Sequence, residues 1–219
     1  MSHRYGISIS SLVFFLFCLL PVSVNAQLDK GLLVGWNRSD WDFQPAWSKE
    51  DLFESKNGFC AGGYLGGEMS GHLGWRGEFL YTRKGAVMSF LGTDENGEPT
   101  GEIRYFHNVD YLEIPFLISW TILTHSAVRP VLYLGPAVDF ELSAKAHAEY
   151  PSGVLNDFES DKTLDTSTST DFSLIFGGGI DIDAGGKVIN LQVRYVMGTQ
   201  EVYNTAKNKT LSVMAGFGI

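Results

Sequence analysis

Hydrophobic and polar residues alternate along most of the chain, as they do in half-buried β-strands. Near the C-terminal end, Ile189, Leu191 and Val193 share one parity, whereas Asn190 and Gln192 occupy the other. Because the side chains of a strand point alternately to its two faces, each such segment has one apolar and one polar face. The pattern predicts an all-β fold with eight strands, at about residues 29–37, 59–70, 73–84, 104–120, 129–141, 172–184, 187–198 and 209–219.

The segments between these strands alternate between short and long. The short ones are 71–72 ("GH"), 121–128 and 185–186 ("GG"), and the longer ones are 38–58, 85–103, 142–171 and 199–208. All short connections therefore fall on one side of an up-and-down meander. Outer-membrane barrels have this asymmetry, with short periplasmic turns and longer outside loops. We therefore predict an eight-stranded antiparallel up-and-down transmembrane β-barrel with both termini on the periplasmic side.

The stretch "YLEIPFLISW" at 111–120 shows why the direction of the two faces matters. Its apolar face carries Leu112, Ile114, Phe116, Ile118 and Trp120. Glu113 and Pro115 lie on the other face. In a soluble barrel or sandwich the apolar face would point inward, whereas in a membrane barrel it would meet lipid.

The size of the barrel favours the membrane orientation. An eight-stranded barrel has an interior just wide enough for side chains. The apolar faces carry many bulky residues that would crowd this interior, whereas the opposite faces are rich in Gly, Ser, Ala and Asn. We therefore expect the bulky faces to contact lipid and the few charged residues to share the lumen.

Two residues interrupt the alternation of this strand. Asp110 has the parity of Leu112, so we expect a β-bulge near 108–110 that resets the face. Pro115 cannot donate a ladder hydrogen bond, so we expect a bulge or a missing bond there. Tryptophans near strand ends also predict interfacial belts. Trp75 and Trp120 would lie toward the short turns, and Trp36 and Trp41 toward the long loops.

Residues 1–26 have the features of a secretory signal peptide. Arg4 precedes the apolar run "ISISSLVFFLFCLLPVSV", and "VNA" at 24–26 is a small-residue cleavage motif. We expect cleavage before Gln27, export, and a barrel domain over residues 27–219.

The charge of the chain limits the classes of partner. It has 25 Asp plus Glu against 16 Lys plus Arg, a formal net charge of −9. Nucleic-acid binding generally requires basic patches, so we expect no nucleic-acid partner. The expected partners are outer-membrane lipid and lipopolysaccharide, together with other envelope proteins. After the signal peptide only Cys60 remains, which excludes an intrachain disulfide.

Several segments resemble the PorT-like outer-membrane β-barrel family of Bacteroidota. They are "YLEIPFL", "GEFLYTRKGAVMS" at 77–89, "YLGPAVDF" at 133–140, "GGGIDI" at 177–182 and "LQVRYVMGT" at 191–199. The resemblance covers nearly the whole exported chain and implies an eight-stranded barrel in the bacterial outer membrane. One departure is the end "GFGI", since such barrels often finish on an aromatic residue; Phe217 is the candidate for that role.

Eight charged residues have the parity that faces the predicted lumen. They are Glu68, Arg76, Glu78, Glu113, Asp139, Asp181, Asp183 and Arg194. An unpaired buried charge is costly, so the carboxylates should gather around the two arginines. We therefore favour a structural ion-pair network that plugs the lumen over a proton or ion path. We expect Arg76, Glu78, Glu113 and Arg194 to form its centre, with some other carboxylates exposed, neutral, or bonded to Tyr and backbone groups.

Other candidate chemistry is weak. The chain has no G-x-S-x-G nucleophile motif, although His107 and His147 would suit a lipid-modifying site near the outer leaflet. The acidic segment "NDFESDKTLD" fails the calcium-loop pattern, with Lys162 at the turn-glycine position and Thr168 at the bidentate-Glu position. The glycines at 177–179 lack a phosphate-loop context and make room in the lumen instead. We expect no catalytic residue, cofactor or metal.

The sequence thus predicts a small outer-membrane barrel with a plugged, polar lumen that acts as a structural or interaction protein through its long outside loops. Two alternatives remain at this stage. One is a lipid-modifying outer-membrane enzyme, and the other is a soluble secreted lipocalin-like binder.

Overall fold

The structure is a computed structural model that describes residues 28–43, 53–93, 96–149, 162–163, 168–203 and 206–219. The predicted signal peptide and most of the acidic segment around 156–165 lie outside these residues. The described part of the chain contains no helix with the length and hydropathy needed to cross a membrane.

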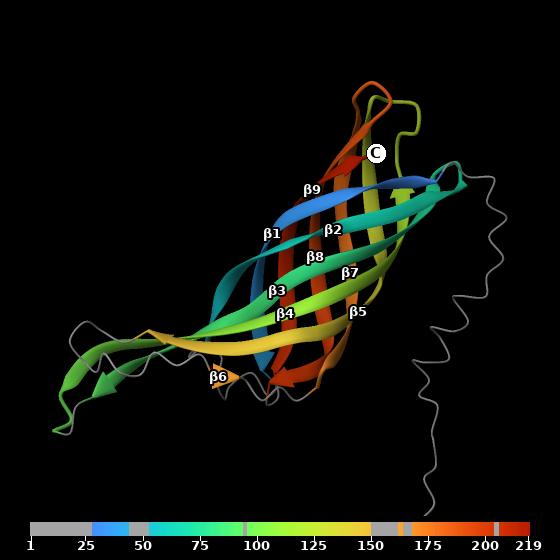
Figure 1. The fold of residues 1–219 in the computed structure, drawn as a ribbon. Helices are drawn as coiled ribbons and strands as arrows, with labels where there is room; N and C mark the ends of the chain where they lie inside the picture. Colours follow the sequence, from blue (N-terminus) through green and yellow to red (C-terminus); the bar gives the residue numbers. More distant parts are fainter. Residues whose placement is uncertain (1–27, 44–52, 94–95, 150–161, 164–167, 204–205) are drawn as a thin grey trace, which may run out of the picture.

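Eight long strands form a closed ring, and each is antiparallel to both neighbours (Figure 1). The described residues contain these eight ring strands and the short β6. Their bounds are β1 Asp29–Phe43, β2 Phe53–Ser70, β3 Leu73–Thr93, β4 Pro99–Thr121, β5 Val128–Glu149, β6 Lys162–Thr163, β7 Thr170–Asp183, β8 Val188–Tyr203 and β9 Ala206–Gly218. β6 has two residues and pairs only at the outer end of β5. The ring closes where β1 pairs with β9, so the predicted eight-stranded up-and-down barrel is confirmed.

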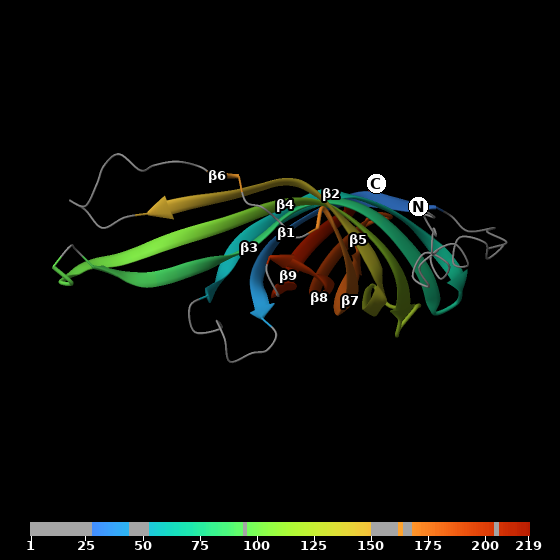
Figure 2. The same ribbon diagram turned by 90° about the horizontal axis from the view of Figure 1, so that it is seen from below.

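The strands continue further than predicted at one end of the barrel. Residues 85–103, expected as a loop, are mostly strand, because β3 runs to Thr93 and β4 begins at Pro99. The ends of β3, β4 and β5 at Thr93, Pro99 and Glu149 project past the other strands. We call this part the extension, and Figures 1 and 2 show it to one side of the ring. The predicted loops 38–58 and 142–171 likewise contain strand residues at both ends. An extension outside the membrane needs no lipid-facing row, so hydrophobic alternation does not mark it.

The opposite end is formed by short turns, as predicted. We call it the turn mouth; it comprises the turns at 71–72, 122–127 and 184–187, and the other end is the loop end. In the last turn the Ala184 N–H donates to the Lys187 carbonyl oxygen at 2.8 Å. Gly185 and Gly186 have φ angles of 69° and 89°, which glycine adopts without the steric penalty of a Cβ.

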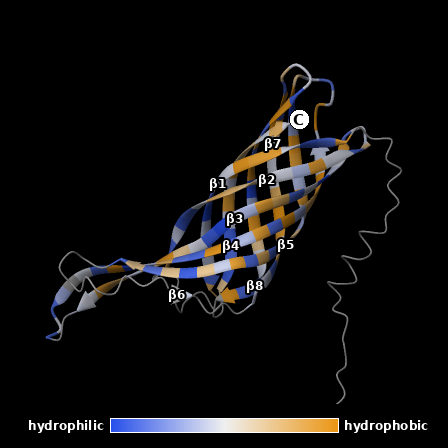
Figure 3. Ribbon diagram, in the orientation of Figure 1, coloured by the Kyte–Doolittle hydropathy of each residue, from blue (hydrophilic) through white to orange (hydrophobic). Residues whose placement is uncertain are grey.

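The two faces of the strands point as the membrane interpretation requires. Leu134 on β5 is 56% exposed and Phe79 on β3 is 60% exposed, whereas Glu78 and Asp139 are fully buried. Figure 3 shows bands of hydrophobic and hydrophilic residues along the strands. Within "YLEIPFLISW", Glu113 and Pro115 are buried, while the Leu112 face is turned outward. This arrangement excludes a soluble lipocalin-like barrel, whose apolar face would line the interior.

The two interruptions in β4 have different outcomes. The prediction that the face is reset at Asp110 is wrong: Asp110 stays on the outer face, where it binds Arg83 at 2.6 Å. The register does shift there, but the extra residue is Leu142 on β5. At Pro115 the β3–β4 ladder is interrupted between the Gly77–Phe116 and Leu80–Glu113 pairs without a change of register. Pro115 therefore removes hydrogen bonds between β3 and β4 but creates no bulge.

Candidate functional site in the barrel interior

The central feature of the interior is a bidentate ion pair between β8 and β3. Arg194 places Nη1 and Nη2 each 2.6 Å from one carboxylate oxygen of Glu78. Gln192 Oε1 accepts from Arg194 Nη2 at 2.9 Å and from Nε at 3.2 Å. Both charged side chains are almost wholly buried, so the paired geometry offsets the cost of removing them from water.

Glycines on β7 make room for this pair. A Cβ at Gly177 would lie 3.0 Å from Arg194 Cγ, and one at Gly179 would lie 2.9 Å from Gln192 Cβ. The glycine run at 177–179 therefore lets the two long side chains of β8 fold across the lumen. This role agrees with the sequence interpretation of the run.

A second ion cluster is centred on Lys84 of β3. Its Nζ lies 2.8 Å from Glu113 Oε2 on β4 and 2.9 Å from Asp139 Oδ2 on β5. Ser173 of β7 donates to the same Asp139 oxygen at 3.4 Å. Glu113 and Asp139 are register partners on adjacent strands, so the ammonium group neutralises two carboxylates that would otherwise repel.

Arg76 lies nearer to the turn mouth and has a different environment. Its guanidinium carbon is 4.2 Å from the ring centroid of Tyr64 and 5.1 Å from that of Tyr133. Its contact with the Glu78 carboxylate is long, with 4.0 Å between Nη1 and Oε1. Arg76 is therefore held mainly by cation–π contacts.

The structure places five of the eight predicted lumen charges in the interior. Arg76, Glu78, Glu113, Asp139 and Arg194 are all buried in the interior. They form two clusters, however, because Glu113 binds Lys84 and not an arginine.

Three predicted carboxylates lie outside these clusters. Glu68 and Asp183 are exposed near the turn mouth. Asp181 is partly buried and accepts a hydrogen bond from Asn190 Nδ2 at 2.5 Å. These three positions are close to strand ends, where the lumen opens to water, so parity alone does not bury them.

Lys84 is absent from the predicted lumen charges, although its parity is a signal for it. It has the parity of Thr82, but it is the last residue of the predicted strand 73–84 and borders the predicted loop 85–103. Continuation of β3 to Thr93 makes Lys84 an interior residue with 1% side-chain exposure. The predicted lumen charges contain more carboxylates than arginines, and this excess is a second signal for a further buried cation.

Aromatic and aliphatic side chains fill the interior toward the loop end. The cluster comprises Trp41, Phe43, Ala86, Val109, Tyr111, Ala144, Val202 and Ala206, with Phe53 packed against it. The Phe43 and Phe53 rings are 4.7 Å apart, and those of Trp41 and Phe53 are 5.8 Å apart. The prediction of Trp41 in an interfacial belt is therefore wrong, because Trp41 shares its strand face with the buried residues Asn37 and Phe43 and points inward. Trp36 is exposed on the outer face.

The histidines considered for lipid chemistry do not share one site. His107 is buried inside the barrel, with its ring 5.1 Å from that of Trp41. His147 lies on the β5 part of the extension. A side chain enclosed in the aromatic cluster has no access to a membrane lipid. Among the described residues, no three His, Cys, Asp or Glu side chains are grouped so as to hold a metal ion.

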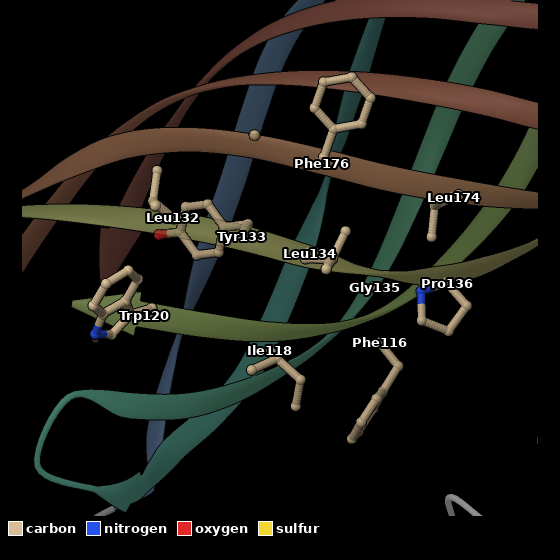
Figure 4. Close-up of a pocket in the computed structure, with 11 residues that line it drawn as sticks. Phe116, Ile118, Trp120, Leu132, Tyr133, Leu134, Gly135, Pro136, Leu174 and Phe176 are labelled. Carbon is tan, nitrogen blue, oxygen red and sulfur yellow. The ribbon is translucent and has the colours of Figure 1, made fainter. Parts of the chain in front are cut away.

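The outer face carries an apolar hollow of about 750 Å³ over β4, β5 and β7 (Figure 4). Its lining includes Phe116, Leu134, Gly135, Pro136 and Leu174. A Cβ at Gly135 would overlap the carbonyl oxygen of Phe116, so the two strands approach closely there. The hollow belongs to the lipid-facing surface and contributes no charged group.

Three solved structures of other proteins are similar to this chain. Neisserial surface protein A superimposes with a TM-score of 0.51 at 14% identity, covering 87% of this chain and 96% of that one. Ail of Yersinia pestis, in complex with the heparin analogue sucrose octasulfate, gives 0.44 at 15% identity over 88% and 99% of the two chains. OprG of Pseudomonas aeruginosa gives 0.42 at 12% identity over 87% and 92%. At these identities the likeness concerns the fold alone.

A comparison with curated proteins finds no match. The profile described as "outer membrane protein beta-barrel domain" matches residues 25–204, which is most of the chain. The narrower resemblance to PorT-like proteins of Bacteroidota stays a prediction. The profile match over residues 25–204, together with the closed ring, the apolar outer face and the charged interior, shows that the chain belongs to the outer membrane protein beta-barrel domain family.

Proposed function

We propose that this outer-membrane barrel is a structural or interaction protein with a closed lumen, and that it acts through its loop end. The observation that carries the proposal is the filling of the interior. The Arg194–Glu78 pair spans the middle, the Lys84 cluster lies beside it, and the aromatic cluster fills the loop end. A barrel of eight strands has no room for an aqueous channel past such side chains.

The extension is the proposed contact surface. By analogy with other outer-membrane barrels, the turn mouth faces the periplasm and the loop end faces outward. The extension then stands outside the membrane, where Leu91 is 72% exposed and the Phe90 and Tyr105 rings stack at 5.7 Å. Arg104 lies over the Phe106 ring at 5.2 Å and 3.7 Å from Glu54. A projecting ribbon that carries an exposed leucine and partly exposed aromatic and basic groups suits contact with lipopolysaccharide or another envelope protein.

The closed lumen is tested by conductance. Purified protein inserted in planar bilayers should show no steady large current, because the interior is occupied by packed and paired side chains. Folding of the inserted sample is checked by its heat-dependent migration in gels. A stable porin-like conductance in the folded sample would contradict the closed lumen.

The contact surface is tested separately. Replacement of residues 89–103 by a two-residue turn should leave the barrel folded and weaken binding to purified lipopolysaccharide in detergent. The matched control is Leu134→Ala, which changes the lipid-facing surface and keeps the extension. Equal lipopolysaccharide binding by wild type and the shortened variant would remove the extension from the proposal.

A further inference from the structure

The interior is accessible at the turn mouth. A polar cavity of about 430 Å³ enters the barrel there. It is lined by turn residues such as His72, Thr124 and Lys187, and by strand residues such as Ser119 and Tyr133. This volume is within the range of about 300–1,000 Å³ that is usual for small-molecule sites. The aromatic cluster lies at the other end of the strands, so a ligand would enter and leave through the turn mouth.

Arg76 is the buried cation of this cavity. It is 6% exposed and lines the cavity together with Tyr133. Its guanidinium carbon lies 4.2 Å from the ring centroid of Tyr64 and 5.1 Å from that of Tyr133. Among the described residues its Nη1 has no hydrogen-bond partner. A buried donor without a hydrogen-bond partner is costly, so an anion that reached Arg76 through the cavity would gain this bond.

Two of the carboxylates near Arg76 have other partners, and a third, Asp29, lines the cavity and interacts electrostatically with Arg76. Glu78 is 4.0 Å from Nη1, but both of its oxygens bind Arg194 at 2.6 Å. Asp181 accepts from Asn190. Asp29 and Glu68 also line the cavity, as do the cations Arg129 and Lys187, so its rim carries both signs of charge. The buried end of the cavity is therefore cationic, while its rim is mixed.

We propose that the turn mouth is a binding site for a small anion, whose carboxylate or phosphate group is held by the guanidinium edge of Arg76. The planar fork of an arginine matches both groups, and the Tyr64 and Tyr133 rings contact the guanidinium before the ligand arrives. The site is distinct from the proposed contact surface, which lies at the opposite end of the barrel.

The test is isothermal titration of the folded barrel in an uncharged detergent with inorganic phosphate and, separately, with succinate. Wild type should bind at least one of the two anions with one site per barrel. Arg76→Gln should weaken binding by about tenfold to a hundredfold, as expected for loss of a hydrogen bond to a charged group. The control Arg83→Gln removes an arginine that pairs with Asp110 on the outer face, and it should bind as wild type does.

The outcomes separate the two sources of the anion. Binding of phosphate alone supports a phosphate-bearing ligand, and binding of succinate alone supports a carboxylate. Failure of wild type to bind either anion, or equal binding by Arg76→Gln, would overturn the proposal. Should Arg76→Gln not fold, Ser119→Phe tests the same site by filling the cavity while Arg76 remains. Unchanged binding by folded Ser119→Phe would also overturn it.

Discussion

Arg194 and Glu78 form their two 2.6 Å bonds across the full width of the barrel. Their strands, β8 and β3, are separated by four steps in either direction around the ring. A pair that joins opposite walls fixes the cross-section of the lumen as well as filling it. It also brings together residues that are 116 positions apart in the sequence.

The first prediction concerns this pair. Arg194→Met and Glu78→Leu should each destabilise the barrel by about 3–5 kcal/mol, because each leaves one buried charge without its partner. The double variant should be more stable than either single variant, since it buries no unpaired charge from this pair. Urea unfolding followed by tryptophan fluorescence in vesicles would measure the three free energies. Additive losses in the double variant would show that the two residues are not coupled.

The second prediction concerns Lys84, the buried cation that is absent from the predicted lumen charges. Lys84→Met should cost about 3–5 kcal/mol of unfolding free energy, because Glu113 and Asp139 lose the charge between them. Addition of Asp139→Asn should restore part of the loss by removing one of the two like charges.

Lys145→Met is the matched control for this experiment, because Lys145 is exposed on the extension. It should leave the unfolding free energy nearly unchanged. The assignment of Lys84 to the interior would fail if both lysine variants unfolded at the same urea concentration as wild type.

The third prediction tests which face meets lipid. Leu134→Arg should destabilise the barrel by about 2–4 kcal/mol, the cost of a charged side chain near the bilayer midplane. Leu91→Arg is the control, because Leu91 is also strongly exposed but lies on the extension. Unfolding from vesicles would compare the two. Similar small effects at both positions would argue against a lipid environment for Leu134.

The fourth prediction concerns the junction between barrel and extension. Gly85 has a φ angle of 147°, and a Cβ there would overlap the carbonyl oxygen of His107. Its N–H and carbonyl groups both bond to Ser39 Oγ, at 2.9 and 2.8 Å. Gly85→Ala should therefore cost at least about 1–3 kcal/mol, as expected for an unfavourable backbone conformation.

The control for Gly85→Ala is Gly77→Ala on the same strand, where an added Cβ would meet nothing within 4 Å. It should change stability by no more than about 0.5 kcal/mol, as a permissive surface position does. The two thermal midpoints of heat-dependent gel migration provide the comparison. A loss at Gly77 as large as that at Gly85 would show that general loss of glycine, and not the local conformation, is responsible.

Local geometry made much of the fold predictable. Alternation with a period of two fixes which residues share a face, so Glu113 and Leu112 had to point in opposite directions. The narrow interior of eight strands then decided that Leu112 faces outward. The same reasoning failed for Trp41, because the tendency of tryptophan to lie at membrane interfaces is weaker than the parity of its strand. It failed at Asp110 because an ion pair with Arg83 satisfies the charge on the outer face.

The sequence by itself determined the strand number, the direction of the faces and the presence of charges in the lumen, because these depend on neighbours along one strand. Only the tertiary structure decided which charges meet. Arg194 binds Glu78 from the opposite wall, Glu113 binds Lys84, and Arg76 lies over two tyrosine rings. These choices depend on register and ring closure, which set the heights at which distant strands present their side chains, and no local pattern records those heights.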